Sequence, residues 1–264
     1  MNQISIRQLF TYPIKGLTPQ PQKSVYLKQG HGIPGDRAFA LMYEDCTNPE
    51  NSQTNNINIP WMKKQNFAMQ NDWAGLAALD CSYNPSTGDL TIKHQQVKLL
   101  TADTNTSQGR DLIDSFFTGY LAAISPSKTA RHPQKSPLRL VGEYNTTRYP
   151  DREAVHISLI SQATLNHLTE LAGQYIDVRR FRPNIVIDGV EAWEEFNLVG
   201  QELQLGSSRI AIASRINRCL NIEVNPETGQ RDIPLLSLLQ NNFQHVQTGV
   251  LATVVVEGEI AIVK

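Results

Sequence analysis

The sequence of 264 residues is poor in cysteine, and this scarcity excludes several kinds of site. Cys46, Cys81 and Cys219 are widely spaced and form no C-x-x-C pair, which argues against a disulfide framework and a zinc ribbon. Three cysteines are too few for a cluster held by four thiolates, so we expect no iron–sulfur cluster in this chain. The sequence also lacks the G-x-S-x-G turn of serine hydrolases and the H-E-x-x-H helix of zinc proteases.

A dominant charge and a long apolar run are missing as well. Lys and Arg number 24 against 25 Asp and Glu, so the net charge of −1 creates no bulk field that attracts nucleic acid or an acidic membrane. No apolar run approaches the roughly 20 residues that a membrane-spanning helix needs. Residues 1–10 alternate apolar with polar side chains and contain no signal-peptide block. We therefore expect a cytoplasmic protein whose partners include no membrane and no nucleic acid.

Most of the sequence has the period-two pattern of β-strands, in short runs separated by Gly, Pro, Asn and Asp. The expected strands are 4–10, 24–27, 38–43, 90–93, 97–100, 185–187, 209–213, 220–224, 250–256 and 259–263. Helical spacing predicts three helices: 110–121, 161–172 between an N-cap at Ser161 and a stop at Gly173, and one opened by Asp232 and Pro234. The fold class expected from this pattern is mainly β (α+β), a barrel or sandwich with a few short helices.

Two polar segments interrupt the pattern. Residues 47–59 are rich in Asn, Pro, Ser and Thr and are predicted to form a long exposed loop. Residues 125–137 combine three prolines with several basic residues, which is typical of an interdomain linker. We therefore predict two domains, residues 1–128 and residues 129–264.

Cys219 is the first candidate for a chemical role. It follows the apolar run 210–213 and has Arg215 and Arg218 close by, so we expect it near the end of a buried strand. Cationic neighbours favour the thiolate, which is the form that binds metals or carries sulfur. The alternative is a buried cysteine with a purely structural role, because free cysteines are often buried.

A second candidate is the basic segment 179–189. Three arginines within four positions, including Arg180 and Arg182, come shortly before Asn184 and an apolar strand. Arginine binds phosphate through forked, bidentate hydrogen bonds, and the asparagine amide can both donate to and accept from the edge of a heterocycle. The alternative is a solvated basic turn, which is what most short charge runs are.

Two glycine-containing loops in the first half supply further basic side chains. Residues 12–16 contain Lys15, and residues 30–37 contain Arg37. Glycines let backbone N–H groups approach an anion, and these two cations can complete a phosphate cradle. Neither loop matches a P-loop or a dinucleotide-binding fingerprint. We expect Asp36 to pair with a neighbouring arginine or to cap the turn.

Four motifs occur in a fixed order: YPIKG at 12–16, GDRAFAL at 35–41, RFRPNIVIDG at 180–189 and RCLNIEVNPETG at 218–229. Together they resemble the MOSC proteins, named after the C-terminal domain of molybdenum-cofactor sulfurases, preceded by the family's N-terminal β-barrel domain. The resemblance spans nearly the whole chain and includes relatives such as the mitochondrial amidoxime-reducing component. It implies a β-barrel-like N-terminal domain, a MOSC β-barrel, and binding of the molybdenum cofactor (molybdopterin), a pterin dithiolene that carries a phosphate.

The resemblance also implies roles for individual residues. Cys219 matches the cysteine that ligates molybdenum in relatives. Thr164, at the start of the expected helix 161–172, matches a region that contacts the cofactor, and a helix N-terminus suits an anion in any family. The remaining residues expected to bind the phosphate or the pterin are Lys15, Arg37, Arg182 and Asn184, together with Arg180 of the same basic run.

The function implied by the resemblance is that of a molybdenum-dependent oxidoreductase. It would remove oxygen from an N-oxygenated small molecule, with electrons from a separate donor protein of the ferredoxin or flavin reductase type. Two alternatives stay open. In one, Cys219 carries a persulfide for sulfur transfer, with Cys46 or Cys81 approaching in space as the second thiol. In the other, the chain stores or delivers the cofactor without turnover.

Overall fold

The computed structural model describes residues 4–44, 58–130, 137–152, 154 and 157–263. Almost all of the predicted loop at 47–59 lies outside these residues, as do Cys46 and part of the predicted linker at 125–137. The described chain consists mainly of strands, with three α-helices and several short 3-10 helices. The predicted mainly β (α+β) class is therefore confirmed.

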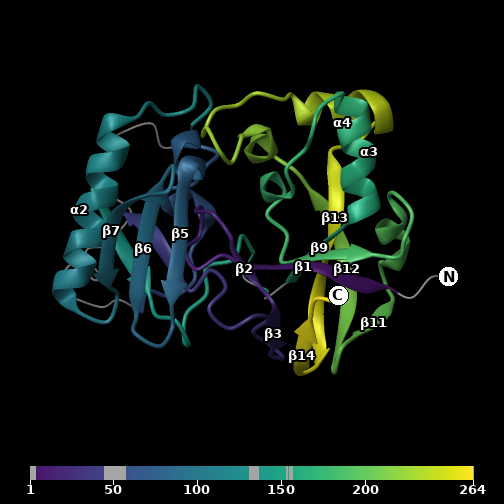
Figure 1. Ribbon diagram of the computed structural model, residues 1–264, viewed down its shortest axis with the longest axis horizontal. Helices are drawn as coiled ribbons and strands as arrows, with labels where there is room; N and C mark the ends of the chain where they lie inside the picture. The colour runs from purple at the N-terminus through teal and green to yellow at the C-terminus, as the bar shows by residue number, and fades with distance from the viewer. Residues whose placement is uncertain (1–3, 45–57, 131–136, 153, 155–156, 264) are drawn as a thin grey trace.

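A seven-stranded sheet occupies the right side of Figure 1 and contains strands from both ends of the sequence. Its strands in spatial order are β11 (Glu202–Leu205), β12 (Ser208–Asn217), β13 (Gln247–Val256), β9 (Ile157–Ser161), β10 (Ile185–Asp188), β1 (Ser5–Thr11) and β2 (Gln20–Gln22). The pair β9–β10 is parallel, and helix α3 (Gln162–Ala172) provides the crossover that a parallel pair requires.

The antiparallel pairing of β1 with β10 places two loops side by side. Leu9 lies opposite Ile185, and the next residue along β1, Phe10, donates its backbone N–H to the carbonyl of Asn184 at 2.8 Å. The residues that follow β1 therefore run beside the basic segment that precedes β10. These are two of the segments that the sequence singles out for chemistry.

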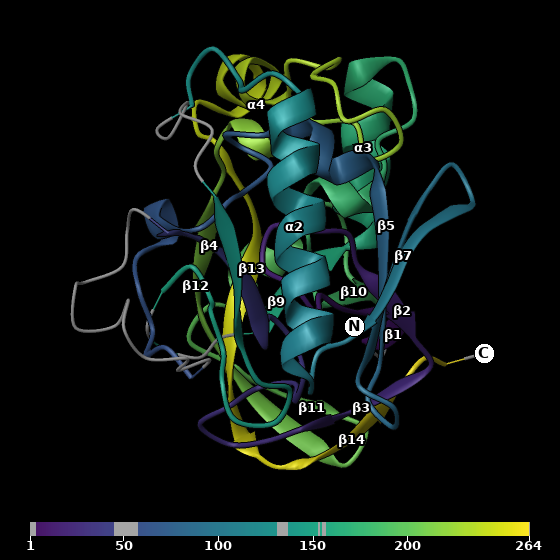
Figure 2. The same ribbon diagram turned by 90° about the vertical axis from the view of Figure 1, so that its left-hand side faces the viewer.

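Three smaller sheets complete the fold. They pair β3 (Ser24–Leu27) with β14 (Gly258–Ala261), β4 (Phe39–Tyr43) with β8 (Leu138–Gly142), and β6 (Asp89–His94) with both β5 (Leu79–Asn84) and β7 (Val97–Asp103). Helix α2 (Ser107–Ala123) packs against β7 and β8 at the opposite end of the molecule from β11 and β12 (Figures 1 and 2). Strand pairing crosses residue 128 in β1–β10, β3–β14 and β4–β8, and the two-domain division stays a prediction.

Barrel closure is not visible in the hydrogen bonding of the described strands. The largest sheet begins at β11 and ends at β2, and these two edge strands do not pair with each other. The expectation of barrels is thus replaced by a set of open, packed sheets. Separately, no helix in the described ranges is long and apolar enough to cross a membrane.

Local sequence signals predicted the helices well. The segment 110–121 lies inside α2, and α3 begins where Ser161 Oγ accepts a hydrogen bond from the backbone N–H of Thr164. The α3 helix ends at Gly173, whose φ of 64° is the left-handed stop that glycine adopts without strain. Helix α4 (Leu235–Phe243) starts directly after Pro234.

The predicted strand at 220–224 is wrong. Residues Leu220–Glu223 form a 3-10 helix, η6, in which Ile222 donates to the carbonyl of Cys219 at 3.2 Å. The β-branched composition indicated a strand, but β12 has already ended at Asn217 and local i to i+3 bonds satisfy the backbone instead. The other 3-10 helices described are η2 (Lys64–Asn66), η3 (Ala74–Ala78), η4 (Val178–Arg180) and η5 (Glu194–Leu198).

Candidate functional site

A pocket of about 390 Å³ lies where the loop after β1, the basic segment before β10 and the segment after β12 meet. Pairing of β1 with β10 brings the first two together, although they are far apart in sequence. Six of the seven predicted site residues line this pocket, and Thr164 does not. The six are Lys15, Arg37, Arg180, Arg182, Asn184 and Cys219.

The pocket is strongly cationic. Asp151 is the only acidic side chain that lines it in the part of the chain that the structure describes. Eight basic side chains line the same pocket: Lys15, Arg37, Lys64, Arg148, Arg152, Arg180, Arg182 and Arg218. Because the whole chain has a net charge of only −1, this concentration of positive charge is local and favours an anionic ligand.

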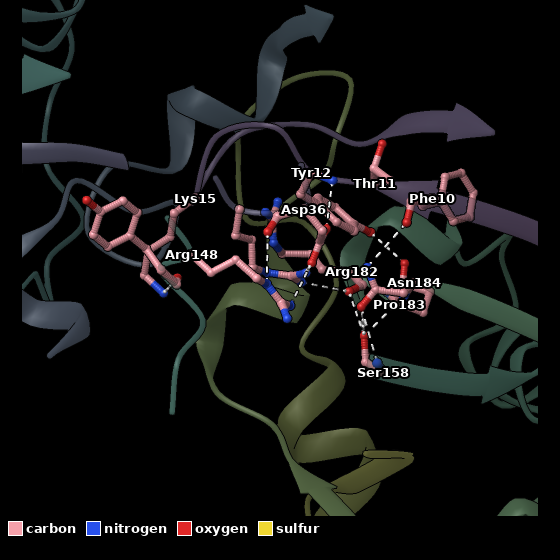
Figure 3. A network of polar contacts seen from close by, with 12 residues as sticks. Phe10, Thr11, Tyr12, Lys15, Asp36, Arg148, Ser158, Arg182, Pro183 and Asn184 are labelled. Atoms are coloured by element: carbon pink, nitrogen blue, oxygen red, sulfur yellow. Dashed lines mark hydrogen bonds and ion pairs between the residues drawn. The ribbon is translucent and has the colours of Figure 1, made fainter. Parts of the chain in front are cut away.

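Two of these arginines, Arg37 and Arg182, contact one aromatic ring, that of Tyr12. Figure 3 shows Tyr12 and Arg182 within the surrounding polar network. The Cζ atoms of Arg37 and Arg182 lie 4.7 and 4.4 Å from the ring centroid, within the range of cation–π contacts. Both arginines have a φ of 53°, a left-handed conformation that is uncommon outside glycine. Burial lowers the pKa of Arg182 to about 10, so this side chain is still cationic at neutral pH.

Asp36 is the buried counter-ion of this arrangement. It is labelled in Figure 3 within the network of polar contacts. Its Oδ1 accepts the backbone N–H of Tyr12 at 2.9 Å, while its Oδ2 accepts from both Arg37 and Arg148. The side chain is 0% exposed, so these contacts are screened little by water. The predicted pairing of Asp36 with a neighbouring arginine is confirmed, and Arg148 is an additional partner from the second half of the chain.

Lys15 is nearly completely buried, with 2% of its surface exposed. Its Nζ donates to the carbonyl of Tyr149 at 2.9 Å and to Oδ1 of Asp151 at 2.5 Å. Burial lowers the pKa of Lys15, and the Asp151 carboxylate acts in the opposite direction. Since 58% of the Asp151 side chain is exposed, the ion pair joins a buried cation to a solvent-accessible acid at the pocket.

Cys219 is exposed and lies directly before η6. The alternative of a buried structural cysteine is therefore contradicted for this residue. The neighbouring Arg218 donates to the carbonyl and hydroxyl of Thr248 and to the carbonyl of Phe181 at 2.8 Å, so its guanidinium is fixed beside the thiol segment. Burial lowers the pKa of Arg218 to about 10, and it remains cationic at neutral pH.

The side chains of Arg180 and Asn184 form most of their hydrogen bonds with other groups of the protein. Arg180 pairs with both carboxylate oxygens of Asp232 at 2.8 Å, and its buried Nε has no partner in the described structure. The Asn184 amide donates to the carbonyl of Phe10 and accepts from the N–H and Oγ of Ser158. These contacts leave one N–H of Asn184, and the Nε–H and one Nη2 N–H of Arg180, for a ligand.

Thr164 lies in a different environment from the other predicted residues. Its hydroxyl donates to Oε2 of the buried Glu195 at 2.8 Å and accepts the backbone N–H of Trp193 at 2.8 Å. Its own backbone N–H is capped by Ser161. The structure therefore does not bring Thr164 to the pocket lining, and its cofactor contact stays a prediction.

Several pocket residues were not assigned a site role from the sequence. Arg148, Asp151 and Arg152 come from the segment before β9, where nothing in the local pattern marks them, and Lys64 belongs to η2. Arg218 was noted only as a neighbour of Cys219. Its position directly before the cysteine was the one available signal, whereas the others are recruited purely by tertiary contacts.

The donor set of the pocket is suited to anions more than to a bare metal ion. No group of three or more His, Cys, Asp or Glu side chains that could hold a metal ion occurs among the residues described. A metal at Cys219 would therefore need most of its ligands from a molecule that brings them along. A cofactor with its own sulfur ligands and an anionic anchor has this property.

Comparisons with known proteins give one family and a set of distant relatives. Residues 146–262 match the family model of the MOSC domain. Mitochondrial amidoxime reducing component 2 of Rattus norvegicus is 37% identical over 92 residues, 34% of this chain and 26% of that protein. Mitochondrial amidoxime-reducing component 1 of Danio rerio is 29% identical over 223 residues, 81% of this chain and 61% of that protein. The chain thus spans between about a quarter and about three-fifths of the length of these relatives.

Solved structures show a weaker likeness. The YUAD protein from Bacillus subtilis aligns over 99% of this chain and 94% of its own, with a TM-score of 0.43 and 10% identity. YiiM from Geobacillus stearothermophilus aligns over 41% of this chain and 54% of its own, with a TM-score of 0.31 and 16% identity.

Proposed function

We propose that the chain, whose residues 146–262 match the MOSC domain, binds the molybdenum cofactor in the cationic pocket and reduces N-oxygenated small molecules. The observation that carries this proposal is the convergence of eight basic side chains and one exposed thiol, Cys219, on a single pocket. The similarity to amidoxime-reducing components supports the class of substrate.

The residues of the pocket fit such a cofactor. Two buried polar atoms on its lining residues have no partner in the described structure: Nε of Arg180, a donor, and Oδ1 of Asn221, an acceptor. Gly16 also lines the pocket, with a φ of 84°, and a Cβ there would lie 2.7 Å from the carbonyl oxygen of Ala68. Unpaired donors and acceptors in a cationic pocket suit a ligand that carries both an anion and a heterocycle edge.

We assign the protein groups the following tasks. Lys15, Arg37 and Arg182 neutralise the phosphate and dithiolene charge. Asn221 and the remaining N–H of Asn184 hydrogen-bond the pterin edge. Cys219 supplies a thiolate ligand, and the cationic Arg218, fixed by its bonds to Thr248 and Phe181, directly precedes it in the chain. The cofactor, when bound, supplies a metal that changes oxidation state and exchanges an oxygen atom with the substrate.

The proposal requires a separate electron donor, of the ferredoxin or flavin reductase type. Among the described residues, Cys219 is the one cysteine that lines the pocket, since Cys81 is buried in a separate hydrophobic cluster. A two-electron reduction of an N-oxygenated compound therefore draws its electrons from another protein. The cytoplasmic location of the protein stays a prediction.

Sulfur transfer is the second candidate, favoured by the exposure of Cys219 among cationic side chains. Cys81 does not serve it as a second thiol: it is 4% exposed, and burial raises its pKa to about 12. Cys46 lies outside the described residues. The same chain would then act without a bound metal. A carrier that holds the cofactor without turnover is the third possibility, separated from the first by assays of turnover.

The test measures molybdenum by elemental analysis and pterin by fluorescence after oxidation, on protein from a host that makes the cofactor. Wild type is compared with Cys219→Ser and with Cys81→Ser, a control thiol outside the pocket. We expect metal and pterin in near-equal amounts in wild type and in Cys81→Ser. Cys219→Ser should lose metal while keeping part of the pterin, because its other anchors remain.

The possible results distinguish the oxidoreductase, sulfur transfer and the cofactor carrier. Wild type without metal and without pterin would contradict the proposal, and a persulfide assay on Cys219 would then decide on sulfur transfer. Wild type with both, but without reduction of benzamidoxime when a chemical or flavin-based reductant is supplied, would leave the cofactor carrier as the conclusion.

A further inference from the structure

We propose that Tyr12 is the positioning residue of the anion pocket, because its ring holds the guanidinium groups of Arg37 and Arg182 in place before any ligand arrives. The inference rests on the proposed function only in requiring an anionic ligand. It concerns a residue that does not line the pocket and acts through the two arginines that do.

Tyr12 is itself held in place by apolar packing, by its hydroxyl and by its backbone N–H. The side chain is 0% exposed and belongs to the apolar cluster that contains Phe181. Its hydroxyl donates to the carbonyl of Pro183 at 3.0 Å, and its backbone N–H donates to Asp36 at 2.9 Å. Tyr12 is therefore bonded to the segment that carries Arg182 and to the residue that precedes Arg37. A side chain anchored in this way can serve as a rigid reference for both arginines.

The two guanidinium groups need such a reference because like charges repel each other. Arg37 and Arg182 lie within 4.7 Å of the same ring centroid, and Nη2 of Arg37 reaches the carbonyl of Arg182 at 3.5 Å. Arg37 has a carboxylate partner in Asp36, whereas the Arg182 head group donates to a neutral carbonyl, that of Leu17. The electron-rich face of an aromatic ring attracts both cations and offsets part of their mutual repulsion.

The backbone conformation of Arg37 and Arg182 indicates that arginine is needed at these two positions for its side chain. Both have a φ of 53°, where glycine or asparagine is accommodated at lower cost. Strain of this kind persists when the surrounding structure over-determines it and is concentrated at functional sites. Both arginines therefore combine a left-handed backbone with a side chain that contacts the Tyr12 ring and lines the same pocket.

A merely structural role for Tyr12 predicts a different pattern of consequences. Any loss of the ring would then lower stability and leave anion affinity unchanged in the molecules that fold. A positioning role predicts that anion affinity follows the aromatic face and not the hydroxyl. Tyr12→Phe keeps the face and removes the bond to Pro183, whereas Tyr12→Leu removes the face.

The experiment measures binding of inorganic pyrophosphate to cofactor-free protein by calorimetry, and cofactor content on protein from a cofactor-competent host. Tyr43→Leu is the matched control, because Tyr43 is also 0% exposed and does not line the pocket. Its hydroxyl accepts a hydrogen bond of 2.7 Å from Nε1 of Trp73. We expect Tyr12→Phe and Tyr43→Leu to bind pyrophosphate within about twofold of wild type and Tyr12→Leu to bind about tenfold more weakly. Cofactor content should fall in Tyr12→Leu alone.

Replacement of Tyr12 by pentafluorophenylalanine keeps the inference testable even if Tyr12→Leu does not fold. This residue has nearly the shape of phenylalanine but reversed ring electrostatics, so pyrophosphate affinity should fall about tenfold relative to Tyr12→Phe. Equal affinity of these two variants, equal affinity of folded Tyr12→Leu and wild type, or no pyrophosphate binding by wild type would each overturn the inference. Wild type that binds pyrophosphate but no cofactor would reject the proposed function, and the variant series would still decide on Tyr12.

Discussion

Replacing Asp36 by asparagine removes the buried negative charge on which the cationic pocket depends. Asp36 is 0% exposed, and its Oδ2 accepts hydrogen bonds from both Arg37 and Arg148. The asparagine can keep the acceptor that faces the N–H of Tyr12, but its NH₂ group then points at two guanidinium groups. Asp36→Asn thus preserves volume and exchanges two attractive contacts for donor–donor repulsion.

The magnitude follows from burial. The Arg37 and Arg148 side chains are 16% and 6% exposed, so solvent does little to compensate the lost carboxylate. Hydrogen bonds to charged groups contribute about 1.5–3 kcal/mol each, and removal of one partner from a buried ion pair costs about 3–5 kcal/mol. We expect Asp36→Asn to lower the free energy of unfolding by about 4 kcal/mol, which corresponds to a fall in Tm of roughly 10 °C for a chain of this size.

Urea unfolding monitored by circular dichroism measures this loss through the midpoint at unchanged slope. Asp188→Asn is the control, because the Asp188–Arg7 pair is 44% and 53% exposed, and it should cost no more than about 1 kcal/mol. Phosphate should restore part of the stability of Asp36→Asn, since an anion in the pocket replaces the missing charge. A loss below about 1 kcal/mol, equal to the control, would show that Asp36 does not balance the buried arginines and would refute this reasoning.

Three further substitutions test other parts of the structure. Gly249→Ala should lower the free energy of unfolding by about 3 kcal/mol in urea, because φ is 68° and a Cβ would lie 2.4 Å from the carbonyl oxygen of Leu159. Burial raises the pKa of Asp114 to about 6, so the folded state binds its proton more tightly than the unfolded chain. The stability of wild type relative to Asp114→Asn should therefore fall by about 2 kcal/mol as pH rises from about 4 to 6, and a flat difference would contradict this. Thr164→Val should cost about 2 kcal/mol by removing the hydroxyl that bonds the buried Glu195, with metal and pterin content unchanged. A loss of cofactor from a stable Thr164→Val protein would instead support the contact predicted from the sequence.

The sequence by itself determined those features that depend on a few adjacent residues. The cap at Ser161 and the stop at Gly173 fixed the ends of α3, because both rely on backbone groups within one turn. The turn before Asp89 contains Asn84, Pro85 and Gly88, residue types that favour turns, and it separates β5 from β6. The order of four short motifs was enough to indicate the family, and residues 146–262 match the MOSC domain.

Local composition was not enough where a choice depended on partners elsewhere in the chain. The segment 220–224 has the composition of a strand but becomes a 3-10 helix, since a strand needs a neighbour to receive its hydrogen bonds. Strand β2 (Gln20–Gln22) was missed for the converse reason, because its polar residues form a strand only by pairing with β1. Thr164 sits at a helix N-terminus as predicted, yet the packing of α3 directs its hydroxyl to Glu195.

The site was determined in two stages. Residue chemistry predicted Lys15, Arg37, Arg182 and Cys219 as site residues, because cations and a thiol are recognisable from their type and neighbours alone. Only the tertiary structure decided which groups complete them. Lys15 meets the carbonyl of Tyr149 134 residues further along the chain, and Asp36 meets Arg148 at a separation of 112 residues. Contacts over such separations depend on the register of whole sheets, which no short segment of the sequence specifies.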